Sequence, residues 1–333
     1  MAPTTPACLA QAGKRADGWT APRPGMFSVV MPAYNHAEYI PEAMGSIQAQ
    51  SLADWELIVV DDGSSDGTAE VAEAIAAVDG RIRIIRQANA GPAAARNAGT
   101  RAARADWLAF LDSDDLWYPR TLEHYADGIA RRPDGQFFHG YRDRLNRDGT
   151  ATATKGQFQD APTGAAELFG RMFLSTMVVC IARALAERCG GFDESLRSCE
   201  DYELFLRLSL LTRFWPIGAA TGLRRRHERN ISTQTGFSRF QEAEVLRRFV
   251  ERQGGSAVVP EELVRRRLAR LYYASARQYF KARCVRKALV AANESLAWRG
   301  SVKVLALKAA CAAIRPLGRD DGRPIPWLRA DGR

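Results

Sequence analysis

Long apolar runs are missing from this sequence of 333 residues, in which no stretch of about 18 uninterrupted apolar residues occurs. That absence argues against a membrane-spanning helix. The first 25 residues are rich in Pro, Ala and Gly and have no apolar segment behind a basic one, unlike a secretory signal. We therefore expect a disordered lead-in over residues 1–25.

Cysteine is also sparse, and its spacing is irregular. The six cysteines form no C-x-x-C pair and no spacing typical of zinc sites, which argues against structural zinc. Reduced thiols in a cytosolic protein are the expectation.

Acidic residues are scarce late in the chain: from Thr221 onward there are 25 Lys/Arg and 10 Asp/Glu, whereas the part before it is net acidic. The two parts therefore differ in electrostatic character.

The first half contains two alternating patterns. Short apolar, β-branched runs recur at intervals of roughly 25 residues, and stretches of helical composition lie between them. The predicted strands are 27–31, 55–60, 82–86 and 107–111, and the predicted helices are 38–50, 66–78 and 92–103. This alternation predicts an α/β fold with a mainly parallel central sheet, helices on both faces, and ligands at the carboxyl ends of the strands.

Polar residues follow three of these strands directly. The first strand runs into PAYNHAEY (32–39), the second into DDGSSDGT (61–68) and the fourth into DSDD (112–115). One acidic loop of this kind can simply end a strand and cap the next helix. Because parallel strands bring all three loops to one rim, the pattern favours a ligand site over three separate caps.

The D-x-D of the fourth loop indicates a metal. In an extended chain Asp112 and Asp114 share a face, and Ser113 points away. Two hard oxygen ligands on one face suit Mg²⁺ or Mn²⁺, which keep positions open for water and substrate phosphates. Such an ion makes a diphosphate a better leaving group, because it neutralises the developing charge.

Four segments occur in this order: PAYNHAEYI, VVDDGSSDGT, GPAAARNAGTRAARADWLAFLDSDD and GGFDESLRSCEDYELFLRL. In order and spacing they resemble the family 2 glycosyltransferases of the GT-A fold. The resemblance covers residues 26–235, and a helical, basic region follows over 236–333. It implies inverting transfer of a sugar from a nucleotide diphosphate sugar, with a UDP-sugar favoured, to a hydroxyl acceptor, with Mn²⁺ or Mg²⁺ as cofactor.

The resemblance also implies roles for single residues. The residues implied in nucleotide-sugar binding are Pro32, Ala33, Tyr34, Asp62, Arg96, Asp112 and Ser113. Among them Asp62 would accept a hydrogen bond from the base, and Arg96 would lie near the nucleotide or, alternatively, be a surface salt-bridge partner. Asp114 would be the direct metal ligand with Asp112 beside it, and Asp115 would give structural support.

Glu200 and Asp201 stand just before an apolar pattern of helical spacing, so capping of that helix is one interpretation. The resemblance implies instead that Asp201 is the catalytic base, which removes the proton of the acceptor hydroxyl. Glu200 would then help to position the acceptor or the base. In RRRHERNIS (224–232) the resemblance implies that His227 completes the metal shell or contacts a phosphate, with an ordinary surface or core histidine as the alternative.

Two rival functions fit parts of the sequence. Residues 63–67 match G-x-S-x-G, which would make Ser65 the nucleophile of a serine hydrolase with His139 or His227 as base. That hypothesis leaves DSDD unexplained. A non-enzymatic protein that binds anionic surfaces would use the basic C-terminal part but would not need the acidic rim. No nucleic-acid-binding motif is present, and we expect no nucleic-acid partner.

The late part of the chain predicts helices. In SVKVLALKAACAAI (301–314) an apolar face is flanked by Lys303 and Lys308, so this helix either packs on its neighbours or lies peripherally on an anionic bilayer. The chain also lacks the QxxRW-like segment of processive polymerases that extrude their product. We expect transfer of one or a few sugars to a glycan or lipid-linked acceptor in cell-surface polysaccharide biosynthesis, in the cytoplasm or at the inner face of the cytoplasmic membrane.

Overall fold

The computed structural model describes residues 25–146, 148–154, 161–225 and 235–314. The chain divides into two compact units, Met1–Glu228 and Arg229–Arg333. All but the last residue of the predicted lead-in lies outside the described residues. The predicted boundary between residues 235 and 236 stays a prediction.

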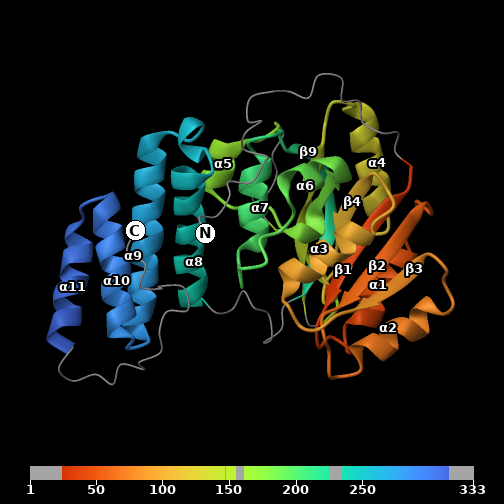
Figure 1. The fold of residues 1–333 in the computed structure, drawn as a ribbon, viewed down its shortest axis with the longest axis horizontal. Coiled ribbons are helices and arrows are strands. Elements are labelled where there is room, and N and C mark those ends of the chain that lie inside the picture. Colours follow the sequence, from red (N-terminus) through yellow and green to blue (C-terminus); the bar gives the residue numbers. More distant parts are fainter. Residues whose placement is uncertain (1–24, 147, 155–160, 226–234, 315–333) are drawn as a thin grey trace, which may run out of the picture. The chain divides into compact units, whose positions relative to one another are not determined.

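The first unit is built on a single mixed sheet (Figure 1). Its described strands are β1 (Phe27–Ala33), β2 (Trp55–Asp61), β3 (Ile82–Arg86), β4 (Trp107–Phe110), β5 (Leu116–Trp117), β6 (Phe137–Leu145), β7 (Ala151–Thr152), β8 (Val179–Ala182) and β9 (Trp215–Arg225). The strand order is β3-β2-β1-β4-β8-β6-β9-β5, and β7 pairs with β6.

The four predicted strands form the parallel half of this sheet. β1 pairs in parallel with both β2 and β4, and β2 pairs in parallel with β3. Every residue of β1 and β2 is buried, as expected for apolar runs covered on both faces. The carboxyl ends of the four strands therefore meet at one edge, where Ala33 lies opposite Asp61 and Asp61 opposite Arg86.

The other half of the sheet departs from the parallel pattern. β8 is antiparallel to β4 and β6, and β5 is antiparallel to β9, while β6 and β9 are parallel to each other. No strand was predicted beyond residue 111, because these segments lack the repeating strand–helix interval of the first half. The central sheet is thus mainly parallel only in its first four strands.

The helices of the first unit begin and end within a few residues of their predicted positions where predictions exist. They are α1 (Ile40–Gln48), α2 (Thr68–Ala76), α3 (Pro92–Ala102), α4 (Thr121–Arg131), α5 (Ala165–Gly170), α6 (Arg183–Cys189) and α7 (Glu200–Leu208). Pro92 occupies the first turn of α3 as predicted.

Helix α3 lies very close to the parallel strands (Figure 1). A Cβ atom at Gly99 would be 2.4 Å from Cγ1 of Val30 in β1, so only glycine permits this approach. The close contact fixes α3 against the sheet one turn from Arg96. The position of Arg96 at the rim follows from this packing.

The second unit is a row of helices: α8 (Thr235–Arg252), α9 (Glu261–Lys281), α10 (Val285–Trp298) and α11 (Val302–Ile314) (Figure 1). The hydroxyl of Ser295 in α10 donates a 2.8 Å hydrogen bond to the carbonyl of Ala269 in α9, which ties the two antiparallel neighbours together. The predicted helical character of this region is confirmed. Among the described residues no helix is both long enough and apolar enough to cross a membrane.

Candidate active site

The loops after β1 and β2 are bound to each other. Asn35 has a left-handed backbone, with φ 54°, and its backbone N–H donates to the hydroxyl of Ser64 at 3.0 Å. Its side-chain oxygen in turn accepts a 2.9 Å hydrogen bond from the backbone N–H of Ser65. The preceding Tyr34 is 48% exposed, so its ring stands free at this rim for a flat ligand to pack on. Pro32 and Ala33, which precede Tyr34 in the chain, are buried in β1.

The loops after β1 and β4 also meet. Nδ1 of His36 lies 2.8 Å from the hydroxyl of Ser113, which is buried. Ser113 was predicted among the nucleotide-sugar residues, and here its side chain joins two loops of the site. The predicted convergence of the three loops is therefore present in the structure.

Asp62 organises the backbone at the start of α3. Its carboxylate accepts hydrogen bonds from Nε2 of Gln87 at 2.7 Å and from the backbone N–H groups of Ala90 at 2.9 Å and Gly91 at 2.8 Å. This carboxylate is already bonded on both oxygens, so a contact with a base would have to add to these bonds. The predicted role of Asp62 in base binding stays a prediction.

The neighbouring Asp61 was not predicted as a site residue. Its Oδ2 accepts a 3.3 Å hydrogen bond from the backbone N–H of Ser64, whereas its buried Oδ1 has no hydrogen-bond partner among the described residues. A buried carboxylate oxygen without a hydrogen-bond partner lowers the stability of the fold, so this oxygen is a candidate acceptor for a hydrogen bond from a ligand. The sequence alone could not show which of the two adjacent aspartates has its carboxylate oxygens bonded within the protein.

The DSDD segment is a turn, and the extended geometry predicted for it is wrong. β4 ends at Phe110, and the backbone N–H of Asp115 donates to the carbonyl of Asp112 at 3.0 Å, which closes the turn. Asp112 and Asp114 are nevertheless partly exposed while Ser113 and Asp115 are buried. The two carboxylates predicted to bind metal are thus the two that solvent can reach.

Asp115 supports the turn, as its predicted structural role requires. Its Oδ1 accepts a 2.9 Å hydrogen bond from the backbone N–H of Arg225 at the end of β9. Burial, followed by the negative charges of Asp114 and Asp112, raises the pKa of Asp115 well above its usual range. Three carboxylates therefore crowd at this turn with incomplete charge compensation.

Arg96 connects the DSDD turn to the start of α7. Its guanidinium donates through Nη2 to Asp112 and through Nη1 to Glu200, each at 2.7 Å, and its side chain is only 6% exposed. Burial opposes the charge, but these two carboxylates outweigh it, and the pKa of Arg96 lies above its ordinary value. The surface salt bridge considered for Arg96 is wrong, because the close packing of α3 on β1 buries it.

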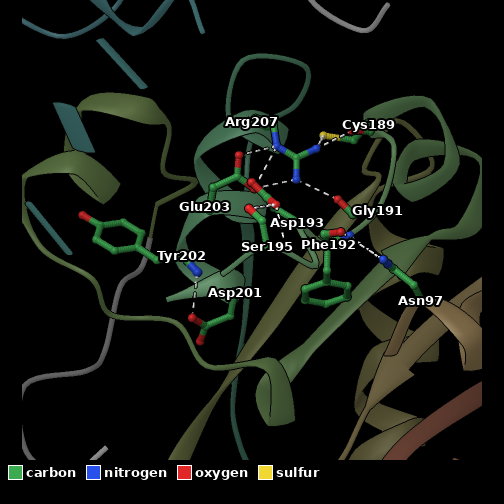
Figure 2. A network of polar contacts seen from close by, with 10 residues as sticks. All are labelled: Asn97, Cys189, Gly191, Phe192, Asp193, Ser195, Asp201, Tyr202, Glu203 and Arg207. Atoms are coloured by element: carbon green, nitrogen blue, oxygen red, sulfur yellow. Dashed lines mark hydrogen bonds and ion pairs between the residues drawn. The ribbon is translucent and has the colours of Figure 1, made fainter. Parts of the chain in front are cut away.

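Asp201 lies in the first turn of α7. The residue before the pair, Cys199, has a left-handed backbone with φ 62°, which turns the chain sharply into the helix. Oδ1 of Asp201 accepts a 2.7 Å hydrogen bond from the backbone N–H of Tyr202 (Figure 2). Burial and then the charge of Glu200 raise the pKa of Asp201 to about 6, although the positive charge of Arg96 acts the other way.

The segment that leads into α7 is fixed at two points (Figure 2). Asn97, next to Arg96 on α3, pairs with the backbone of Phe192: its Nδ2 donates to the carbonyl at 2.9 Å and its Oδ1 accepts from the N–H at 2.8 Å. Arg207 donates to the carbonyls of Cys189 and, at 2.7 Å, Gly191. The position of Asp201 is therefore set by residues that sequence patterns did not single out.

Arg142 of β6 is a further residue that the sequence did not reveal. Burial and the charge of Arg224 lower its pKa, and the negative charges of Asp201 and Asp115 oppose that shift. Its charge therefore interacts with both the base candidate and the DSDD turn. No motif in 137–145 singled it out.

The hydrolase hypothesis finds no support in the geometry. The hydroxyl of Ser65 contacts the side chain of Asn35 at 3.4 Å. His139 is buried in β6 with Nδ1 3.3 Å from the carbonyl of Gly140, and burial lowers its pKa to about 4. His227, the other proposed base and the predicted metal or phosphate ligand, lies outside the described residues.

Comparison with known proteins agrees with this arrangement. Residues 28–184 match the family "Glycosyl transferase family 2". This part of the chain is a family 2 glycosyltransferase domain by sequence. The chain is 37% identical over 126 residues to "Putative teichuronic acid biosynthesis glycosyltransferase TuaG" of Bacillus subtilis (strain 168), a match that covers 38% of this chain and 50% of TuaG. The chain thus spans about half the length of that curated relative.

Two solved structures share the fold. TarS of S. aureus superposes with a TM-score of 0.63 at 19% identity, over 87% of this chain and 53% of TarS. The mannosyltransferase PcManGT of Pyrobaculum calidifontis, in complex with GDP-Man and Mn²⁺, gives 0.53 at 19% identity, over 92% and 87% of the two chains. The predicted GT-A fold with a C-terminal helical region is confirmed.

The rim of this domain offers a divalent cation part of the ligand set that it needs. Among the described residues no group of three or more His, Cys, Asp or Glu side chains could enclose a metal by itself. Asp112 and Asp114 offer two reachable carboxylates, and the crowded negative charge at the turn is what a cation would offset. Mg²⁺ and Mn²⁺ suit such a site, because they take their remaining ligands from water and substrate phosphates.

The buried pair of Arg207 and Glu203 makes a testable contribution to folding of this family 2 domain. Nη2 of Arg207 lies 2.6 Å from Glu203, and the two side chains are 5% and 2% exposed. Replacing Arg207 by Met leaves a buried carboxylate and two carbonyls without their donor, so we expect a loss of about 3–5 kcal/mol in the free energy of unfolding. Urea denaturation followed by circular dichroism measures this.

Arg120→Met is the matched control, because Arg120 makes the same kind of pair with Glu123 on the surface. We expect it to change stability little. If both variants unfold at the same urea concentration as the parent chain, Arg207 does not hold this segment.

Proposed function

We propose that this chain is a metal-dependent, inverting glycosyltransferase that moves a sugar from a nucleotide diphosphate sugar to a hydroxyl of a glycan or lipid-linked acceptor. The observation that carries the proposal is the bridge made by Arg96, whose 2.7 Å bonds to Asp112 and Glu200 join the nucleotide and metal side of the rim to the start of α7. The candidate base, Asp201, therefore stands beside the candidate diphosphate site.

The donor half of the proposal uses the rim formed by the first three loops. The exposed ring of Tyr34 offers a surface for the base, and the unpartnered Oδ1 of Asp61 can accept a hydrogen bond from a base N–H, with Asp62 as the alternative acceptor. TarS has been solved with UDP-GlcNAc and PcManGT with GDP-Man, which supports a nucleotide sugar as donor. We favour a UDP-sugar.

The transfer step needs one base. The carboxylate of Asp201 takes the proton of the acceptor hydroxyl as the oxygen forms its bond to the anomeric carbon. The bond from that carbon to the diphosphate oxygen breaks on the opposite side, so the configuration inverts and the nucleoside diphosphate leaves. Bound Mn²⁺ or Mg²⁺ at Asp112 and Asp114 would supply charge neutralisation for the leaving diphosphate.

The chain's own residues prepare this step. Arg96 bonds Glu200 in the first turn of α7, and Asn97 bonds Phe192 in the segment that leads into it, so that Asp201 is positioned before substrate arrives. Arg142 provides positive charge that interacts with Asp201 and with Asp115 of the DSDD turn. Such fixed charges stabilise a transition state without reorganising during the reaction.

The names of the relatives support a proposal for the acceptor class and the cellular setting. TuaG carries a name from teichuronic acid biosynthesis, and other matched proteins are the hyaluronan synthase of Pasteurella multocida and the chondroitin synthase of Escherichia coli. We propose a role in cell-surface polysaccharide biosynthesis, with transfer at the cytoplasmic face of the membrane.

Transfer should depend on pH through Asp201. The pKa of its carboxyl is raised to about 6, and a base acts only when deprotonated. We therefore expect kcat/KM to fall tenfold per pH unit below about pH 6 and to level off above it. The measurement is kcat/KM across this range, because this ratio reports ionisations of the free enzyme.

The variant Glu200→Gln sharpens this test. It removes the negative charge that helps to raise the pKa of Asp201, so the acidic limb should move to lower pH. An unchanged limb in this variant, or a rate constant that does not respond to pH, would argue against Asp201 as the titrating group.

The proposal is tested by incubating the purified chain with a panel of UDP- and GDP-sugars and Mn²⁺ and measuring release of the nucleoside diphosphate. We expect release from at least one donor, its suppression by EDTA and its recovery with added Mn²⁺. Release from no donor in the panel, with or without a range of acceptor glycans, would count against the proposal.

A further inference from the structure

One side of α9 carries a line of basic side chains. Arg266, Arg270, Arg277 and Lys281 are exposed and follow one another at intervals of four or seven residues, which places them on the same side of the helix. Tyr273 lies within this line, 5.9 Å from the guanidinium of Arg277. At the α-helical rise the line is about 22 Å long. We call these four residues the basic stripe.

The basic stripe has no acidic counterpart. Across residues 25–146, 148–154, 161–225 and 235–314, none of its four members forms an ion pair. Other sides of the same helix differ, since Arg265 pairs with Glu261 at 2.9 Å. Arg267 likewise pairs with Glu242 of α8 at 2.5 Å. The nearby carboxylates therefore pair with neighbouring arginines, and the positive charge of the basic stripe is not compensated.

The surrounding helices add to this charge and supply exposed apolar side chains. Residues 261–314 contain twelve Lys/Arg and three Asp/Glu. On α11, Val302 and Leu305 are 82% and 55% exposed and lie three residues apart, on one side of the helix. Arg299, three residues before Val302, donates a 3.1 Å hydrogen bond to Glu262 at the start of α9, so α11 begins near the end of α9 that carries Arg266.

We propose that α9 and α11 dock this chain on an anionic lipid bilayer. The basic stripe would contact lipid phosphates, and Val302 and Leu305 would enter the boundary between headgroups and acyl chains. Exposed aliphatic side chains near the start of this charged helix favour a bilayer over a soluble polyanion, which needs charge alone. The proposal goes beyond sugar transfer and does not depend on it, because the surface lies wholly in α9 and α11.

The test is flotation of the full chain with vesicles. We expect binding to phosphatidylcholine vesicles that contain phosphatidylglycerol, little binding to phosphatidylcholine alone, and weakening by salt. Each basic residue near an anionic surface is worth about fivefold in partitioning, so R266Q/R270Q/R277Q/K281Q should bind several hundredfold more weakly. V302S/L305S should weaken the binding that remains at high salt.

The matched control is R104Q/R131Q/R188Q/R213Q, which removes four exposed charges from the first unit and should keep most of the binding. Equal loss in the two quadruple variants would overturn the proposal, as would vesicle binding that the stripe variant retains. Binding of the stripe to soluble dextran sulfate without flotation would also overturn it. All variants are compared only after their thermal unfolding midpoints match the parent, and R266K/R270K/R277K, which keeps the charge, should still float.

Discussion

Asp201→Asn should abolish sugar transfer and leave donor binding intact. The amide cannot accept the proton of the acceptor hydroxyl, and loss of a positioned general base lowers kcat by about 10²–10⁴. Asp201 lies in the first turn of α7, and its neighbour Glu200 is the residue that bonds Arg96 of the donor half. We therefore expect an unchanged dissociation constant for the nucleotide sugar. Steady-state transfer rates and donor titrations by calorimetry measure the two quantities.

Glu70→Gln is the control for this variant, because Glu70 is also an acidic residue in the first turn of a helix, α2, and is exposed. If Asp201 only stabilised the start of its helix, the two variants would lose similar, small amounts of stability and neither would lose activity. Full transfer activity in Asp201→Asn would remove this residue from the mechanism.

Asp114→Ala should fail at an earlier step. Asp114 is a reachable carboxylate of the DSDD turn, and its removal leaves Asp112 as the single acidic ligand there, already bound through Oδ1 to Arg96. We expect metal-dependent donor binding to weaken by about 100-fold or more, and transfer to be lost with it. Donor titration with and without Mn²⁺ separates this effect from that of Asp201→Asn.

Asp148→Ala provides the matched change, since Asp148 is an exposed aspartate in a turn that binds only its neighbour Thr150. It should behave like the parent chain. Equal donor affinity in Asp114→Ala and the parent at saturating Mn²⁺ would show that Asp114 is not a ligand.

The parallel half of the fold could be predicted because its signals are local. Apolar runs such as 55–60 must be buried on both faces, and Pro92 marks the first turn of a helix from its own geometry. Parallel pairing then brings the loop ends together by necessity. Strands β6, β8 and β9 of the other half of the sheet could not be predicted in the same way, because each finds its partner only through contacts distant in sequence.

The candidate site was predictable in its residue types and less so in its connections. Asp112, Asp114 and Asp201 could be selected because carboxylates at strand and helix ends have recognisable chemistry. The link made by Arg96 spans 104 positions in the sequence to Glu200, and no pattern encodes it. In the same way, no sequence pattern shows the left-handed backbone at Cys199 or the bonds from Asn97 and Arg207 to the segment before α7.

Asp62 and Asp61 show that a sequence motif does not specify which carboxylate oxygen makes which hydrogen bond. The predicted base contact fell on Asp62, whose oxygens are bonded to Gln87, Ala90 and Gly91. The oxygen without a partner belongs to Asp61. Adjacent identical residues on a strand end point to different sides, and which side faces the rim depends on the loop packed against it.

The central claim is that the rim is a metal-dependent site for a nucleotide diphosphate sugar. Its most direct test is a thermal-shift titration of the full chain with a panel of nucleotide sugars, with Mn²⁺ and with EDTA. We expect at least one donor to raise the unfolding temperature in Mn²⁺, no donor to do so in EDTA, and the shift to vanish in Asp114→Ala but persist in Asp201→Asn. Stabilisation by no donor in the presence of Mn²⁺, or an equal shift in EDTA, would contradict the claim.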